Sequence, residues 1–287
     1  MNSLDSLFDL LILLSGAATF ATMFSASLRL GPKALHRVTE HPGLFLRTLA
    51  AVWLAIPLFT VLVIYKLGVV GTSATLLLLM SVCPATPAIL TFVRIIRSYT
   101  ATAFVALFLT TLTEPILIPY WTRFMSKFHY VDLTIQPGQV LIVLVPTVFL
   151  PSVLGFLIHK LSLKAAPSLA RVSDVVDLVG TGACVVLILH QGLPFLFRVP
   201  PATFVATIII TAADAVFGYW AARPNRAEQK AMAAAAALGN PALALVVVEV
   251  IYHEIGAAVL VSVYVVLRSI AVLPLVLWLR HLAATDR

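Results

Sequence analysis

The sequence predicts an all-α polytopic membrane protein with nine transmembrane helices. Of its 287 residues, 61% are hydrophobic and only 11% are charged, and the mean hydropathy is +1.05. A soluble domain needs more charge on its surface, so this composition excludes one. We interpret the formal charge of +7 as basic residues that anchor loops at a lipid bilayer, and we expect no nucleic-acid partner.

Nine apolar runs are long enough to cross a membrane, because a spanning helix needs about 20 mostly apolar residues. Two of these runs are interrupted by proline. No basic segment precedes the first run, so we expect no cleaved signal peptide. The approximate limits are 7–28, 44–65, 70–96 (interrupted), 100–120, 139–159, 173–191, 201–222, 229–250 (interrupted) and 255–279.

The basic residues alternate in number from one connection to the next, and this predicts the orientation. Lys and Arg concentrate in cytoplasmic loops. We therefore expect a multi-pass protein of the cell (inner) membrane with its N-terminus outside and its C-terminus in the cytoplasm. Arg268 lies within the last run. The richer connections hold Arg29, Lys33, Arg37, Arg47, Arg94, Arg97, Lys160, Lys164, Arg171, Arg223, Arg226, Lys230, Arg280 and Arg287, and the poorer ones hold Lys66, Arg123, Lys127 and Arg198.

The two interrupted runs share a pattern. In each, a polar residue precedes Pro-Ala and an aliphatic stretch, as in TPAILTF (86–92) and NPALALV (240–246). Proline removes a backbone donor, and the groups that it frees survive at membrane depth only where protein or water satisfies them. Paired interruptions in two halves of a chain point to the binding site of an inverted-repeat transporter. Ordinary proline kinks are the alternative.

On the transporter interpretation, the halves contain four and five helices, and the two broken helices cross near the middle of the membrane. The ends of half-helices carry partial charge, so the crossing forms a polar spot. Thr86 and Asn240 can both donate and accept hydrogen bonds there. The predicted substrate-binding residues are Pro84, Thr86, Pro87, Thr91, Gly239, Asn240 and Pro241.

Three ionisable residues inside apolar runs are functional candidates by default. Glu114, Asp214 and Arg268 are candidates for proton coupling. Each has a structural alternative. Glu114 would be an exposed cap near the outer end of its run, Asp214 a carboxylate hydrogen-bonded between helices, and Arg268 either the partner of Asp214 in an internal ion pair or a contact for an anionic substrate.

Two further groups have structural interpretations. Asp174 and Asp177 fall in the first turns of the sixth run, where acidic residues complement the helix dipole. The segment 121–138 is expected to be a loop at the membrane interface, where aromatic residues gather. Its aromatic residues are Trp121, Phe124, Phe128 and Tyr130.

Three segments carry a resemblance to a known family. They are FSASLRLGPKALHRVTEHPGLFLRTLAAVWLAIPLF (24–59), CPATPAILTFVRIIRSYTATAFVALFLTTLTEPILIP (83–119) and RAEQKAMAAAAALGNPALAL (226–245). Through them the sequence resembles the bile acid:sodium symporter family over nearly its whole length. The resemblance implies inverted repeats, a panel domain, a core domain and two crossing broken helices. The panel would hold the runs 7–28, 139–159 and 173–191, and the core would hold 44–65, 70–96, 100–120, 201–222, 229–250 and 255–279.

The positions that correspond to the family's sodium ligands are altered in this sequence. A hard cation is held by several oxygen atoms at close range. Of the residues at these positions, Asn240 alone is kept, so we do not expect sodium at the family's usual sites. The others have become Ile89, Leu90, Ala103, Leu107, Ala235 and Gly239.

The leading hypothesis is a secondary active transporter or facilitator of a small organic anion that works by alternating access. The alternative is a permease for an oxyanion or arsenite-like solute of a related fold, which a reactive Cys83 beside the first break would favour. A membrane enzyme is not expected, because the sequence shows no Ser-His-Asp set, no metal-ligand spacing and no nucleotide loop. We expect no cofactor and no bound metal.

Overall fold

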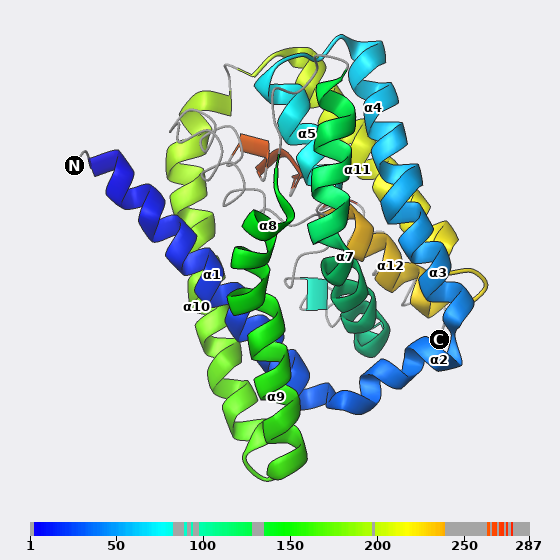
Figure 1. Cartoon of the computed structure of the whole chain (residues 1–287). Coiled ribbons are helices and arrows are strands. Elements are labelled where there is room, and N and C mark those ends of the chain that lie inside the picture. The colour runs from blue at the N-terminus through cyan, green and yellow to red at the C-terminus, as the bar shows by residue number, and fades with distance from the viewer. Residues whose placement is uncertain are drawn as a thin grey trace.

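The computed structural model of the protein describes residues 3–82, 89, 90, 93, 98–127, 135–196, 199–238 and, in part, 263–277. Every regular element among these residues is a helix (Figure 1). The elements are α1 (Ser3–Leu30), η1 (Pro32–His36), α2 (Arg37–Glu40), α3 (Pro42–Ala50), η2 (Ala51–Ala55), α4 (Ile56–Leu67), α5 (Thr72–Val82), α7 (Thr100–Ser126), α8 (Pro137–Leu144), η3 (Val145–Phe149), α9 (Leu150–Leu161), α10 (Ala166–Leu196), α11 (Pro201–Ala221) and α12 (Arg226–Leu238).

Five helical stretches in the described part of the chain are long and apolar enough to cross a membrane. They coincide with five of the nine predicted runs, and they confirm an integral, multi-pass membrane protein. The stretches are Asp9–Leu30, Pro42–Leu67, Thr100–Ser126, Pro137–Leu161 and Pro201–Ala221. Of the other runs, α10 contains 173–191, while α5 and α12 cover the beginnings of the two interrupted runs. The count of nine stays a prediction.

The first group of helices is α1, α9 and α10, which pack along one another (Figure 1). Glycine allows their backbones to approach closely. A Cβ atom added at Gly155 of α9 would lie 2.6 Å from the Cβ atom of Ser27 in α1, and one added at Gly180 of α10 would lie 3.1 Å from that of Ala18. Small residues at such contacts are how membrane helices associate, because lipid gives no hydrophobic force between them.

The second group is built around α11, which packs against α12 and α4 and also meets α5. Here too a glycine sets the distance, since a Cβ atom at Gly218 would lie 2.3 Å from the carbonyl oxygen of Met232. The alanine-rich stretch of α12 presents small side chains, and residues 231–237 are all buried. The two interrupted runs therefore begin in helices that pack in the same group.

The two groups meet at α7 through aromatic rings. Phe104 of α7 lies edge-on to Phe156 of α9, and Phe108 lies edge-on to Phe149 of η3, with ring centroids 5.9 Å apart in both pairs. Edge-to-face pairs of this kind are favourable beyond their buried area. These ring pairs join the two groups beside the direct contact of α7 with α8, which continues through η3 into α9.

The helix α7 corrects two expectations. It runs through Pro115 and Pro119 and ends only at Ser126. Trp121 is therefore not in an interfacial loop; its side chain is buried, and its indole N–H donates to the carbonyl oxygen of Trp53 at 3.0 Å. Glu114 is not an exposed cap, because the continuing helix places it in the interior with an exposed fraction of 0%.

Several of the basic connections meet at one end of the molecule. Arg37 forms an ion pair with Glu228 (2.8 Å), and Arg47 donates to the carbonyl oxygen of Arg223 (2.7 Å). These contacts join the connection after α1 to the connection between α11 and α12. Their side chains come from loops that the charge alternation had predicted to lie on the same side of the membrane.

Asp174 also differs from its predicted role. The helix α10 begins at Ala166, so Asp174 lies beyond its first turns and cannot complement the dipole at its start. Its carboxylate instead forms an ion pair with Arg29 of α1 and accepts a hydrogen bond from the Ser25 hydroxyl. This pair is more than a third exposed on both sides, and it fixes α1 against α10.

Candidate functional site

An ion pair lies in the interior of the second group. The guanidinium of Arg268 donates from Nη2 to Oδ2 of Asp214 at 2.5 Å. Asp214 is on α11 and is 1% exposed, and Arg268 is 5% exposed. Charges buried in this way must be paired, because an isolated ion away from water is very costly. Of the alternatives for Arg268, the structure shows the internal ion pair.

The same guanidinium donates to three backbone carbonyl groups. Nε donates to Ala237 at 2.7 Å, Nη2 to Ala236 at 3.1 Å, and Nη1 to Met80 at 3.4 Å. The first two acceptors are at the end of α12, and the third is near the end of α5. Arg268 therefore links the helices that begin the two interrupted runs.

A small cavity lies beside the ion pair. About 10 Å³ is open to the centre of a water molecule, which is close to the minimum that one water needs. Three hydroxyl-bearing residues line it together with Arg268, so it has the polar partners that a water molecule requires. Its walls are Leu77, Met80, Thr207, Ile210, Thr211, Tyr264 and Arg268.

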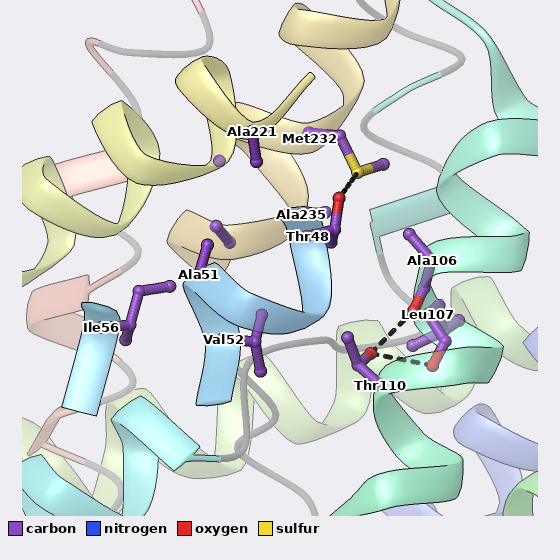
Figure 2. A pocket seen from close by; sticks show the side chains of 12 residues that line it. Thr48, Ala51, Val52, Ile56, Ala106, Leu107, Thr110, Ala221, Met232 and Ala235 are labelled. Atoms are coloured by element: carbon purple, nitrogen blue, oxygen red, sulfur yellow. Dashed lines mark hydrogen bonds between the residues drawn. The ribbon is translucent and has the colours of Figure 1, made fainter. Parts of the chain in front are cut away.

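A second cavity lies between α7, α11, α12 and the η2 segment, with about 20 Å³ open to the centre of a water molecule (Figure 2). Its hydroxyl groups belong to two threonines, and each of them donates to a backbone carbonyl of its own helix. Thr48 donates to Leu44 at 2.9 Å and lies 3.8 Å from the sulfur of Met232, and Thr110 donates to Ala106 at 2.9 Å. The lining residues are Thr48, Ala51, Val52, Ile56, Ala106, Leu107, Thr110, Gly218, Ala221, Met232, Ala235 and Ala236.

This second cavity includes Leu107 and Ala235, two of the positions that the resemblance in sequence assigns to the family's sodium ligands. Three more of these positions, Ile89, Leu90 and Ala103, are also buried, with exposed fractions of 1% or less. All five side chains are hydrocarbon and supply no oxygen. Sodium needs several oxygen ligands, so these residues do not fit it.

Glu114 is a further buried carboxyl group. Neither of its side-chain oxygens has a hydrogen-bond partner within the described part of the chain. The neighbouring Thr113 accepts a hydrogen bond from the indole N–H of Trp53 at 3.1 Å. Glu114 thus lies beside a hydrogen-bonded contact between α7 and η2. In the sequence it is far from both Asp214 and Arg268.

The other predicted site residues lie outside the described residues, and so does Cys83. They are Pro84, Thr86, Pro87, Thr91, Gly239, Asn240 and Pro241. Within the ranges that the structure describes, no three His, Cys, Asp or Glu side chains gather as a metal site would require. Sequence reasoning missed Thr48, Thr110 and Met232, because buried threonines and methionines have no distinctive spacing.

Apolar helices of membrane-spanning length around buried charged groups define an integral membrane protein with a polar interior, the class to which transporters belong. The model of the sodium bile acid symporter family matches residues 17–198. This is more than half of the chain, and the protein belongs to that family. Because the members of this family are membrane transporters of small molecules, the protein is a membrane transporter with a small-molecule substrate. No curated protein matches the chain.

The family match ends before α11. Asp214, α12 and Arg268 therefore lie beyond the matched residues. The buried ion pair therefore lies in the part of the chain, residues 199–287, that the family match does not cover.

Proposed function

We propose that the protein is a secondary transporter that carries a small organic anion by alternating access and does not use the family's usual sodium sites. Family membership supports the transport role and the class of substrate. The observation that carries the sodium-independent part is the chemistry of the five buried ligand positions, which are now Ile89, Leu90, Ala103, Leu107 and Ala235. The substrate would bind near the crossing of the two interrupted helices, at Thr86 and Asn240.

In this proposal α1, α8, η3, α9 and α10 form the panel, and α3, α4, α5, α7, α11 and α12 belong to the core. The close backbone contacts within each group support two bodies that move as units. The ring contacts of Phe104 and Phe108 lie at the boundary between them. The meeting of basic connections at one end supports an N-terminus outside and a C-terminus in the cytoplasm, in the inner membrane.

A proton is the alternative coupling ion. Glu114 and Asp214 are carboxyl groups in the interior of apolar helices, and such groups serve as proton relays in membrane transporters. Asp214 is held by Arg268, whereas Glu114 lacks a hydrogen-bond donor among the described residues. Of the two, Glu114 is therefore the candidate that can change its protonation without breaking an ion pair.

The test is uptake into proteoliposomes. A panel of labelled organic anions, with a bile acid and arsenite included, is offered in sodium or in choline buffer, with and without an imposed pH gradient. We expect uptake of at least one organic anion above that of empty vesicles, at equal rates in the two buffers. Uptake that requires a sodium gradient would contradict the proposal, and uptake of arsenite alone would favour the thiol-seeking alternative through Cys83.

A further inference from the structure

The prolines of the two interrupted runs leave defined carbonyl groups without donors. In an α-helix, the carbonyl of one residue accepts from the N–H four residues later, and proline has no N–H. Pro84 lies four residues after Met80, and Pro241 lies four residues after Ala237. The carbonyls of Met80 and Ala237 therefore cannot receive their α-helical hydrogen bonds, whatever the backbone does at the prolines.

Arg268 donates to both of these carbonyls. Its Nη1 reaches Met80 (3.4 Å) and its Nε reaches Ala237 (2.7 Å), while Nη2 serves Ala236 (3.1 Å) and the carboxylate of Asp214. The planar guanidinium carries five N–H donors in a fixed fork. One side chain can therefore satisfy acceptors on three elements at once.

The acceptors also make this point electronegative. The backbone carbonyl oxygens of Met80, Ala236 and Ala237, each with a partial negative charge, converge on the guanidinium of Arg268. Asp214 adds a full negative charge from α11. A buried site with this excess of negative charge requires a cation. The positions that the resemblance assigns to the family's sodium ligands are hydrocarbon in this chain.

We infer that Arg268 is a built-in cation that joins the helices of the two interrupted runs and so takes over the bridging role of an exchangeable sodium ion. The inference rests on the proposed function for the statement that sodium is not used. Its structural part stands on the hydrogen bonds. Because the cation is covalently attached, the two helix ends stay joined whatever ions the solution contains.

The test compares thermal unfolding of purified variants in detergent. Arg268→Ala removes the cation and adds its volume to the small cavity beside it. We expect a lower midpoint than in the wild type, and a selective recovery when ethylguanidinium, at millimolar concentration, replaces choline. Arg29→Ala is the matched control, because Arg29 also pairs with an aspartate but in an exposed position, and ethylguanidinium should not stabilise it. The wild-type midpoint should not change when sodium replaces choline.

A second comparison separates helix joining from simple pairing with Asp214. The double variant Asp214→Asn/Arg268→Met removes both charges but leaves the carbonyls of Met80 and Ala237 without donors. We expect its midpoint to stay well below that of the wild type. A double variant as stable as the wild type, or an Arg268→Ala variant that ethylguanidinium does not stabilise, would overturn the inference.

If Arg268→Ala cannot be purified, Arg268→Lys takes its place. Lysine keeps the charge for Asp214 but concentrates its donors on one nitrogen, so it cannot span both helix ends. A destabilised Lys variant supports helix joining, and a Lys variant with the wild-type midpoint overturns it. These measurements need no substrate. Sodium-dependent uptake by the wild type would therefore refute the proposed function without altering the structural result.

Discussion

The indole N–H of Trp121 donates to the carbonyl oxygen of Trp53 across the contact between α7 and η2, at 3.0 Å. Trp53 lies in the π-helical segment η2, four residues before Pro57, which has no N–H to give that carbonyl an α-helical hydrogen bond. Arg268 does the same for the carbonyls that precede Pro84 and Pro241. In all three cases a side chain from another helix replaces the donor that a proline removes, as the low polarity of a membrane interior requires.

Trp121→Phe should destabilise the protein, because it removes the indole donor that the carbonyl of Trp53 has on α7. The loss of such a donor costs about 1–3 kcal/mol. The measurement is the free energy of unfolding in mixed micelles. In a Pro57→Ala background the backbone N–H returns, so the same Trp121→Phe change should cost clearly less. Equal costs in the two backgrounds would show that the indole acts through packing alone.

Gly218→Ala should destabilise the pair formed by α11 and α12. The added methyl group would lie 2.3 Å from the carbonyl oxygen of Met232, and overpacking of this kind costs about 1–3 kcal/mol, more than the roughly 1 kcal/mol gained in helix propensity. Gly182→Ala in α10 is the control, since nothing lies within 4 Å of its added Cβ atom. Gly218→Ala should lower the thermal midpoint, whereas Gly182→Ala should leave it unchanged or raise it. An unchanged midpoint for Gly218→Ala would refute the close contact.

Ala235→Glu returns an acidic residue to a position of the family's sodium site, yet it should not create sodium binding. The carboxyl group would enter a cavity in which Thr48 and Thr110 are the only lining residues with a side-chain oxygen and Leu107 is on the wall, whereas sodium needs several oxygen ligands. We expect a lower unfolding midpoint that is the same in sodium chloride and choline chloride. A stabilisation specific to sodium would show that enough of the old site survives.

The two Arg–Asp pairs should differ strongly in their contribution to stability. Breaking the buried pair with Asp214→Asn should cost about 3–5 kcal/mol, because it leaves an uncompensated buried charge. Breaking the exposed pair with Asp174→Asn should cost about 0–1 kcal/mol. Added salt should reduce the second cost further and leave the first nearly unchanged. Similar costs, or a similar dependence on salt, would contradict the difference in burial.

Hydropathy predicted where the membrane helices lie but not where they end. The helix α10 begins at Ala166, ahead of the predicted run, and α7 continues past the predicted limit to Ser126. The apolar stretch of a helix marks the thickness of the bilayer, while the helix itself continues into the polar region on either side. The predicted roles of Asp174 and Trp121 were wrong for this reason, since both depended on a helix end.

The candidate site was predictable in part. Two opposite charges in apolar runs, Asp214 and Arg268, favour each other as partners in a medium that tolerates neither alone. The sequence analysis did not predict the carbonyl acceptors of Arg268. One of them could have been found, because Met80 lies four residues before Pro84 and its carbonyl therefore lacks an α-helical donor. The burial of Glu114 could not be predicted, because a proline next to it commonly marks the end of a helix, and α7 does not end there.

The glycine contacts at Gly155, Gly180 and Gly218 have a consequence for how this protein tolerates mutation. At each of them an added Cβ atom would lie 3.1 Å or less from a neighbouring atom, so a larger side chain fits only if that neighbour moves. At the boundary between the groups, the rings of Phe104 and Phe156 can give way to other bulky apolar side chains that fill the same space. A scan of all single substitutions should therefore find low tolerance at the three glycines and higher tolerance at the two rings.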